Sequence, residues 1–342
     1  MPLITVVIAV YNTEKYIREA VQSILDQTFT NFELIIIDDA STDNTLEILQ
    51  SFKDDRIVLI SNKTNQGIPK NANTALKLAK GEYIAKMDGD DISHPKRLER
   101  QLAYLNNNPE VVICGSWAQI FDADDVLIRT PVLHNEIKAG LLFLNVMFNP
   151  AIMFRSSLYK HYGCCYNEDF PVLEDYTLWL DALDQVKFAN VPEVLLKYRV
   201  HSSNISVFKK NNQEMLNDYH HKIYIRFFNK LQVNYNDADL IRHRKIGLKQ
   251  YDLLDKNEFI ECLNWFSKLW KHNKKVNYFN QNELKIVIIA NVLYLLKKCA
   301  KSVELYLRAM KFVFNIFGPL GPVKYFRFRW LAKANLNSAE RF

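Results

Sequence analysis

Several motifs that define common enzyme classes are absent from this sequence. It contains no Gly-x-Gly-x-x-Gly fingerprint, no Walker loop, no Gly-x-Ser-x-Gly elbow and no His-Glu-x-x-His pair. Each of these motifs performs a defined task, such as cradling phosphates, raising a nucleophilic serine or binding zinc. Their absence argues against dehydrogenases, P-loop enzymes, α/β-hydrolases and zinc proteases.

Cysteine is scarce, and long hydrophobic runs are lacking. The five cysteines of the 342-residue chain include no Cys-x-x-Cys pair, which argues against a disulfide framework or a zinc site and favours reduced thiols. No run reaches the roughly 18 apolar residues that a spanning helix needs. The first residues show neither a basic region nor a cleavage site, so we expect no signal peptide and a cytoplasmic location.

The charge is divided unequally along the chain, although the net formal charge is only +6. Residues 1–210 carry 21 Lys and Arg against 27 Asp and Glu, whereas residues 211–342 carry 23 against 11. An acidic part suits a bound cation. A basic part suits an anionic membrane surface, a nucleic acid or an acidic acceptor. We therefore expect different partners for the two parts.

The first hundred residues alternate between two patterns. Short β-branched apolar runs predict buried strands, and apolar residues repeating every three or four positions predict helices. The predicted strands are Thr5–Val10, Glu33–Ile37, Ile57–Ser61 and Glu82–Met87, and the predicted helices are Glu14–Gln27, a segment ending at Phe52, Asn71–Lys80 and Pro95–Asn108. Asn12 or Thr13 is expected to cap the first helix. The alternation predicts an α/β fold with a mostly parallel sheet and helices on both faces.

The second half of the chain changes character. Residues 111–121 and 126–131 resemble strands around the turn at 122–125, and residues 136–200 mix both patterns. Beyond about residue 211 the sequence becomes helical, aromatic and rich in Lys and Asn. We therefore predict a boundary near 205–215, between an α/β part over 1–210 and a basic, mainly helical part over 211–342.

An acidic cluster directly follows the fourth predicted strand. Its sequence is Met87-Asp88-Gly89-Asp90-Asp91, and three carboxylates so close together repel one another. A divalent cation offsets that repulsion, and Mg²⁺ or Mn²⁺ commonly binds one or two carboxylates together with substrate phosphates. Gly89 allows the backbone to turn tightly. The cluster predicts a metal site at the edge of the sheet where ligands bind; a solvated acidic turn is the alternative.

Three further polar features each allow two readings. Asp38 and Asp39 either accept hydrogen bonds from a base or ribose, or cap the following helix. Glu174 and Asp175 precede an apolar helical stretch, where they act either as a general base or as favourable charges at a helix start. His201 is either a metal or phosphate ligand or a surface histidine.

Taken together, these segments resemble the family 2 glycosyltransferases. The matching segments, in the family's order and spacing, are Val6–Asn12, Ile37–Asp43, Asn65–Gly67, Lys80–Ala85, Met87–Asp91, Glu174–Asp175 and His201–Asn204. The match covers residues 3–207 and is specific as a set, whereas each segment alone is not. Similar bacterial enzymes build lipooligosaccharide, capsule or O-antigen chains.

The resemblance implies a GT-A fold, Rossmann-like, and sugar transfer with inversion at the anomeric carbon. Nucleotide-sugar binding is expected in residues 1–121 and the acceptor side in 122–210. The expected donor is a UDP-sugar, carrying N-acetylglucosamine, galactose or N-acetylgalactosamine, with Mn²⁺ or Mg²⁺. The expected acceptor is a hydroxyl of a glycan or lipid-linked glycan. A nucleotidyltransferase and a non-catalytic nucleotide-sugar-binding module are the alternatives.

The resemblance also implies roles for single residues. Ala9, Tyr11 and Asp39 would line the base pocket, and Asn65, Gly67, Lys70, Asp88 and Gly89 would also contact the donor. Asp88, Asp90 and His201 would bind the metal. Asp175 would be the catalytic base, with Glu174 beside it. Relatives often carry Arg where this chain has Ala72, so Lys70 is expected to take over at the diphosphate; they also often carry His where this chain has Asn149.

Residues 303–333 lie outside the resemblance and mix apolar, aromatic and basic side chains. Residues 303–317 have helical spacing, and 324–331 alternate bases with aromatic rings. Such stretches can lie in a membrane interface, so we expect peripheral contact with the cytoplasmic face of the inner membrane. Packing on the catalytic part or on another subunit is the alternative. Homo-oligomers are compatible with the sequence, and nucleic acid is not expected as a partner.

Overall fold

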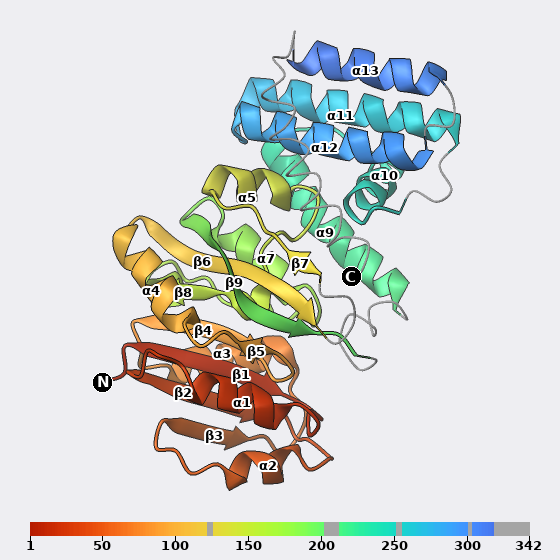
Figure 1. Ribbon diagram of the computed structural model, residues 1–342. Helices are drawn as coiled ribbons and strands as arrows, with labels where there is room; N and C mark the ends of the chain where they lie inside the picture. Colours follow the sequence, from red (N-terminus) through yellow and green to blue (C-terminus); the bar gives the residue numbers. More distant parts are fainter. Residues whose placement is uncertain (122–125, 202–211, 251–254, 300–302, 318–342) are drawn as a thin grey trace. The chain divides into compact units, whose positions relative to one another are not determined.

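The computed structural model describes residues 1–121, 126–201, 212–250, 255–299 and 303–317 of the chain (Figure 1). The chain forms two compact units. The first comprises residues 1–132 and 147–204, and the second comprises residues 133–146 and 205–342. The chain therefore leaves the first unit at residue 132 and returns to it at residue 147.

A single sheet organises the first unit. Its strands are β1 (Ile4–Val10), β2 (Phe32–Asp38), β3 (Ile57–Ser61), β4 (Tyr83–Asp88), β5 (Ile92–Ser93), β6 (Val111–Phe121), β7 (Leu127–Ile128), β8 (Met153–Arg155) and β9 (Lys187–Arg199). Their order is β3-β2-β1-β4-β8-β6-β9-β5, with β7 beside β6. The first four strands are parallel, as are β6 and β9, and the short strands β5, β7 and β8 pair antiparallel. The expected α/β fold with a mostly parallel sheet is confirmed.

Helices cover both faces of this sheet. The helical segments of the first unit are α1 (Ile17–Leu25), α2 (Thr45–Ser51), α3 (Ile68–Leu78), α4 (Arg97–Asn107), η1 (Asn149–Ala151), α6 (Ser157–Lys160) and α7 (Glu174–Ala182). Alternate residues of β1, β2 and β4 form one hydrophobic core with α1 and α4. Helix α3 packs on β1 and β2 without joining that core, and Figure 1 shows it behind the sheet. Each fully buried aliphatic side chain contributes about 1.5–3 kcal/mol to this packing.

Several predicted boundaries agree with the structure, but the expected cap of the first helix is wrong. Strands β3 and β6 have the predicted limits. Helix α1 begins only at Ile17, after Tyr16, which makes no side-chain capping bond. Neither Asn12 nor Thr13 caps it with a side chain: Asn12 Oδ1 accepts from the Thr42 N–H instead, and the Thr13 N–H donates to Thr45 Oγ1 at the start of α2. Helix α3 begins earlier than expected, directly after Gly67.

The second unit is helical. Its helices are α5 (His134–Leu141), α9 (Gln213–Leu231), α10 (Asp237–Gly247), α11 (Lys256–Val276), α12 (Gln281–Cys299) and α13 (Val303–Phe317). Helix α5 packs against α12, so residues 133–146 belong with the C-terminal helices. The assignment of the acceptor side to residues 122–210 stays a prediction. Within the described part of the chain, no helix combines the length and apolar character needed to cross a membrane.

Candidate active site

The parallel strands bring four of the expected residues to one edge of the sheet. Ala9 is paired with Ile37 of β2 and with Asp88 of β4 in the sheet register. Tyr11 follows β1 and is 48% exposed, whereas Asp39 follows β2 and is buried. Because parallel strands end at a common edge, these side chains start close together, where ligands of such sheets bind.

The loops after β1 and β2 are joined by hydrogen bonds. Asn12 Oδ1 accepts from the Thr42 N–H (2.8 Å), and the Asn12 N–H donates to Ser41 Oγ (3.0 Å). The Glu14 N–H donates to Asp43 Oδ2 (3.1 Å). Asn12 adopts a φ of 54°, in the left-handed region that Asn tolerates better than most residues. Much of the motif at residues 37–43 therefore holds these two loops together.

Asp39 organises the next loop. Its Oδ1 accepts from Asn62 Nδ2 and from the Gln66 N–H, both at 2.8 Å, and its Oδ2 accepts from the Gly67 N–H at 2.9 Å. Burial raises the pKa of Asp39, but these hydrogen bonds and that of Asn71 outweigh burial and hold the pKa below its usual value. Asp39 is therefore an ionised acceptor. It does not cap α2, because Asp43 accepts from the Thr45 N–H instead.

Asn65, Gly67 and Lys70, which are also expected to contact the nucleotide-sugar donor, lie at or just before the start of α3. Gly67 has a φ of 83°, which glycine adopts without steric cost. Asn65 and Lys70 are exposed, whereas Ala72 is buried. Residues two positions apart on a helix lie on different faces, so Lys70 would approach the diphosphate from another face of α3 than a side chain at position 72. A role for Lys70 at the diphosphate stays a prediction.

The acidic loop brings Asp90 together with His201. His201 Nε2 lies 2.9 Å from Asp90 Oδ2, and the two side chains are only 14% and 16% exposed. Asp88 is 40% exposed, with Lys86 Nζ 3.4 Å from its Oδ1. Burial and the charge of Asp88 raise the pKa of Asp90, and the hydrogen bond from His201 opposes this. Burial and the charges of Asp90 and Asp88 raise the pKa of Asp91 further.

The acidic loop and His201 would offer a divalent cation only a partial set of ligands, and a metal site here stays a prediction. No group of three or more His, Cys, Asp or Glu side chains converges as a metal cage within the described ranges. Mg²⁺ and Mn²⁺ at nucleotide sites are usually held by one or two carboxylates, with phosphate oxygens and water completing the shell. Asp90 and His201 are in contact and Asp88 acts on Asp90 through its charge, so these residues could supply part of such a shell, and added positive charge would relieve the repulsion between the carboxylates.

Gly89 lies in the turn that follows β4, where close packing leaves no room for a side chain. A Cβ at this position would lie 2.3 Å from Val10 Cγ1, and the φ of Gly89 is outside the left-handed region. The glycine therefore lets the acidic loop rest on the end of β1. The turn expected from the sequence is present at residues 89 and 90.

The expected base lies in the first turn of α7. Leu173 precedes it with a φ of 65°, Glu174 is buried, and Asp175 Oδ1 accepts from the Tyr176 N–H (2.7 Å). Burial, followed by the charges of Glu174, Asp175 and Asp88, raises the pKa of the Tyr166 phenol well above its usual value. Carboxylates from the end of β4 and the start of α7 thus both act on the pKa of the same buried phenol.

Sequence reasoning missed two buried residues, Arg97 and Asn73, whose hydrogen bonds hold the backbone around this site. Arg97 is fully buried, and its Nη2 donates to the carbonyls of Lys86 (2.6 Å) and Ile152 (3.2 Å). Burial lowers the pKa of Arg97 to about 10, although Asp91 and Asp88 act in the opposite direction. In the sequence Arg97 resembles an ordinary surface residue of an amphipathic helix.

Asn73 was missed for the same reason. Its Nδ2 donates to the Tyr166 carbonyl (2.8 Å), and its Oδ1 accepts from the Tyr166 N–H (2.9 Å). These paired bonds tie α3 to the segment that precedes α7. No local pattern reveals the contact, because its partners are far apart in the sequence.

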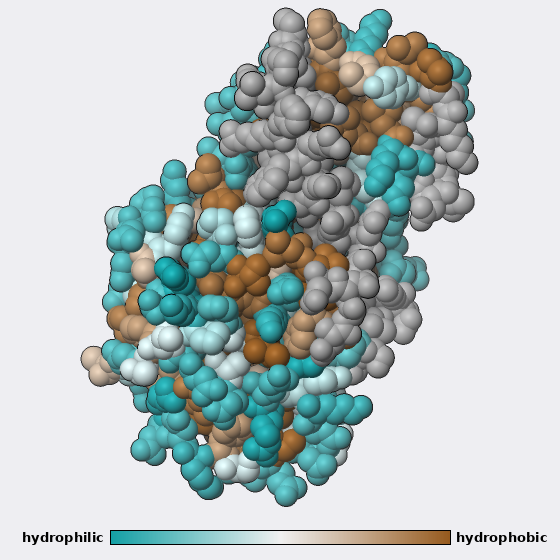
Figure 2. All heavy atoms as spheres, in the orientation of Figure 1, coloured by the Kyte–Doolittle hydropathy of each residue, from teal (hydrophilic) through white to brown (hydrophobic). Residues whose placement is uncertain are grey.

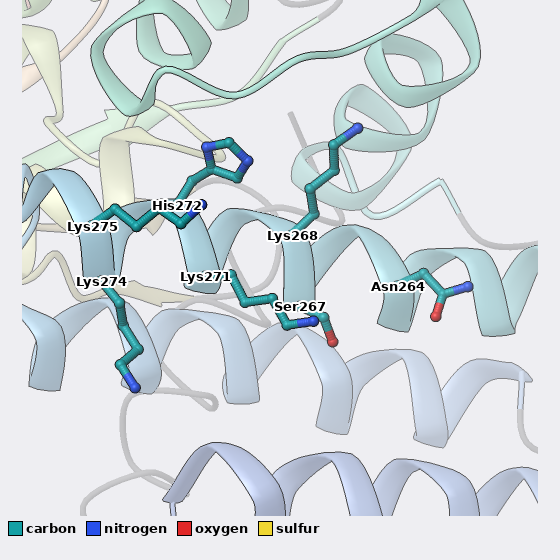
Figure 3. Close-up of a pocket in the computed structure, with 7 residues that line it drawn as sticks. All are labelled: Asn264, Ser267, Lys268, Lys271, His272, Lys274 and Lys275. Atoms are coloured by element: carbon teal, nitrogen blue, oxygen red, sulfur yellow. The ribbon is translucent and has the colours of Figure 1, made fainter.

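A hollow of about 640 Å³ occurs elsewhere, in the second unit (Figure 3). Its lining comes from α11 and consists of Asn264, Ser267, Lys268, Lys271, His272, Lys274 and Lys275. None of the expected site residues lines it. Lys268 already pairs with Asp239 at 3.2 Å.

Comparison with known proteins shows which sequences and folds this chain is similar to. The Glycosyl transferase family 2 model matches residues 5–163. An uncharacterized glycosyltransferase of Haemophilus influenzae is 36% identical over 225 residues, covering 62% of this chain and 70% of the relative. The UDP-Glc:alpha-D-GlcNAc-diphosphoundecaprenol beta-1,3-glucosyltransferase WfaP of Escherichia coli is 35% identical over 216 residues, covering 61% and 82%. The structure of S. aureus TarS 1-349 with UDP-GlcNAc has a TM-score of 0.58 at 18% identity, covering 91% of each chain, which shows a common fold.

Proposed function

The chain belongs to glycosyl transferase family 2, and we propose that this glycosyltransferase moves a sugar from a UDP-sugar to a hydroxyl of a lipid-linked bacterial glycan, with inversion. The observation that carries the proposal is the contact of Asp90 with His201 beside Asp88, at the edge where the parallel strands end. The names of two similar proteins support it, since WfaP uses UDP-Glc and a diphosphoundecaprenol acceptor and TarS binds UDP-GlcNAc. N-acetylglucosamine, galactose and N-acetylgalactosamine are the donor sugars to test first.

The donor would lie over the carboxyl edge of β1, β2 and β4. Ala9, Tyr11 and Asp39 would surround the base, and the loop Asn65–Gly67 would lie beside the ribose or diphosphate. Lys70 would face the diphosphate from the first turn of α3, and Gly89 would let the acidic loop approach the donor closely. Asp39 would hold its loop and leave its remaining lone pairs for the nucleotide.

The chemistry would be shared between the acidic loop and α7. Asp88, Asp90 and His201 would hold Mn²⁺ or Mg²⁺, which as a Lewis acid stabilises the charge on a departing diphosphate. Asp175 would take the proton of the acceptor hydroxyl as that oxygen attacks the anomeric carbon. Glu174, buried beside it, would orient the base or the acceptor.

The decisive experiment is the thermal stability of the full chain with UDP, GDP, CDP and TDP, each with and without Mn²⁺. A ligand that binds the folded state raises the melting temperature, so we expect a rise with UDP that depends on Mn²⁺. Asp90→Asn should lose the part of the melting-temperature rise that depends on Mn²⁺. Asp55→Asn, at an exposed position before β3, should keep it.

The other outcomes separate the alternatives. No shift with any nucleotide at millimolar concentration would contradict the transferase proposal. Release of pyrophosphate from a nucleoside triphosphate would favour a nucleotidyltransferase. Tight UDP-sugar binding without turnover on any acceptor extract would favour a non-catalytic binding module.

We also propose that α13 rests on the cytoplasmic face of an anionic membrane, where a lipid-linked acceptor would be found. Its inner face packs in the second unit, yet Val303, Leu307 and Phe314 on its outer side are 76%, 61% and 59% exposed. Figure 2 shows apolar side chains gathered over this helix. Lys311 and Arg308 add positive charge. A 15-residue helix is long enough to lie in a membrane interface but too short to span the membrane. Residues 318–333 of the expected contact lie outside the described residues.

Co-sedimentation with vesicles tests the membrane contact. The wild type should bind vesicles containing anionic phospholipid more strongly than neutral ones. Leu307→Glu and Phe314→Glu should weaken binding several-fold, whereas Ile241→Glu, at an exposed apolar position on α10, should not. A homo-oligomer that these substitutions dissociate, without vesicle binding by the wild type, would show instead that a second copy covers α13.

A further inference from the structure

The last residue of β9, Arg199, contacts the acidic loop through its backbone and its side chain. Its N–H donates to Asp91 Oδ1 (3.0 Å), and its Nε donates to the Asp90 carbonyl (2.9 Å). Its Nη2 forms an ion pair with Glu19 of α1 at 2.5 Å. The Arg199 residue is only 8% exposed. These bonds fix the end of β9 against the backbone of the loop that follows β4.

The same guanidinium also reaches His201 through an aromatic ring. Its Cζ lies 4.8 Å from the ring centroid of Tyr16 and 4.4 Å from that of Phe121. The Tyr16 ring in turn stacks on the His201 ring, with centroids 4.5 Å apart. His201 then contacts Asp90 at 2.9 Å. Arg199 is therefore linked to Asp90 by a direct bond and also by a path through Tyr16 and His201.

We propose that Arg199 is a positioning residue that sets the placement of His201 relative to the Asp90 carboxylate. This inference rests on the proposed function, because it concerns the residues that would hold the cation and the diphosphate. Residues behind metal ligands fix their orientation, and their loss typically weakens metal binding about 10- to 100-fold. Nothing in the motif Tyr198–His201 distinguishes Arg199 from a surface residue of a strand.

The shape of the guanidinium, more than its charge, explains the arrangement. Arginine can donate to a carbonyl and a carboxylate in one plane while its flat face covers aromatic rings, and lysine cannot do all three. Arg199→Lys keeps the positive charge but loses the Nε bond and the flat stacking surface. The substitution therefore separates positioning from simple neutralisation of the three carboxylates.

Arg155 offers a matched control in the same unit. Its guanidinium lies 5.3 Å from the Tyr83 ring, and it donates to the carbonyls of Val111 (3.1 Å) and Leu105 (2.7 Å). In the sheet register it is the partner of Tyr83, the first residue of β4, whereas Asp88 is the last residue of that strand. Arg155→Lys should therefore lower stability in a similar way without changing the site.

The test measures the affinity of the full chain for Mn²⁺ at saturating UDP, by electron paramagnetic resonance of free Mn²⁺. We expect Arg199→Lys to weaken Mn²⁺ binding about 10-fold or more and Arg155→Lys to leave it unchanged, even if both lower the melting temperature. In a His201→Ala background, Arg199→Lys should weaken Mn²⁺ binding much less, because the effects of coupled residues are not additive.

The outcomes are distinguishable. Mn²⁺ binding to Arg199→Lys equal to that of the wild type, or an effect that is fully additive with His201→Ala, would overturn the positioning role. A wild-type chain that binds neither UDP nor Mn²⁺ would instead contradict the proposed function. If Arg199→Lys does not fold, Tyr16→Leu tests the same path to His201, with the same expected loss of Mn²⁺ affinity.

Discussion

Asp175 is the side chain on which the proposed reaction depends most directly. A carboxylate that removes a proton in the transition state contributes about 10²- to 10⁴-fold to the rate. We therefore expect Asp175→Asn to lower kcat by that factor, measured as UDP release with an acceptor extract, while the melting rise with UDP and Mn²⁺ persists.

Asp184→Asn is the control for this prediction, because Asp184 lies just beyond α7 and is exposed. Its kcat should stay within about twofold of the wild type. A near-normal rate for Asp175→Asn would show that another group, such as Glu174, acts as the base.

The residues that sequence reasoning found and missed differ in how local their signals are. Asp90 and His201 belong to short motifs, so they could be named before their contact was known. Arg199 and Tyr16 could not be named, because their importance comes only from partners on other elements. Gly89 was expected at a turn and lies in one, but only the packed side chain of Val10 explains why no Cβ fits.

Among the elements, the paired loops after β1 and β2 allow a direct stability test at Asn12. Asn12→Ala loses the side-chain bonds that Asn12 Oδ1 accepts from Thr42 and forces alanine into a φ of 54°. Asn12→Gly loses only the side-chain bond and tolerates that φ. We expect Asn12→Gly to lower the free energy of unfolding by about 1 kcal/mol, and Asn12→Ala by about 1 kcal/mol more.

Urea denaturation of the two variants checks this difference. Equal losses would mean that the left-handed backbone is not maintained in solution. Leu78→Ala, at an exposed position at the end of α3, is a control whose effect should be within about 0.5 kcal/mol of zero.

The helices of the second unit meet around a buried histidine. His243 on α10 contacts the Leu142 carbonyl through Nε2 (2.8 Å), and its Nδ1 accepts from Trp265 Nε1 (3.0 Å). Burial lowers the pKa of His243 to about 4, and the bond to Leu142 only partly opposes this. The folded state therefore holds a neutral imidazole well below the pH at which the unfolded chain gains a proton.

Linkage then gives the sign of a pH effect. The stabilisation that neutral His243 provides to the folded state is fully present above the unfolded pKa of about 6.5. It is lost as the pH falls toward 4, which lowers the free energy of unfolding by about 3 kcal/mol. The free-energy difference between wild type and His243→Gln should shrink by about that amount between pH 7 and pH 4, measured by urea unfolding. A constant difference for His243→Gln would contradict the buried neutral state.

At the scale of the whole molecule, residues 133–146 belong to the second unit although they lie between two segments of the first. This insertion decides where the chain can be cut to give a folded fragment. The sequence suggests a cut near residue 210, but such a fragment would keep α5 without the α12 helix that it packs against. Ile137 and Leu141 are fully buried in the intact protein. Exposed together, they would form an apolar patch that promotes aggregation.

We therefore expect the fragment 1–210 to be poorly soluble and to bind a hydrophobic dye. A fragment in which a short Gly-Ser linker replaces residues 133–146 should be soluble, because the two flanking residues, Val132 and Met147, both contact Asn190. The Asn190 N–H donates to the Val132 carbonyl (3.0 Å), and its Nδ2 lies 3.6 Å from Met147 Sδ. Equal solubility of the two fragments, measured by size-exclusion chromatography, would contradict this account.

The sequence by itself determined what depends on neighbouring residues. The period of apolar side chains set the parallel strands β1 to β4 and their helices, and short motifs marked the acidic loop and Glu174–Asp175. The tertiary structure decided what depends on residues far apart in the chain. It paired Asp90 with His201, put Arg199 behind them, moved the start of α1 to Ile17 and placed α5 among the C-terminal helices. Local periodicity carries no information about which distant elements meet, because that choice is made by packing and hydrogen bonding in the folded chain.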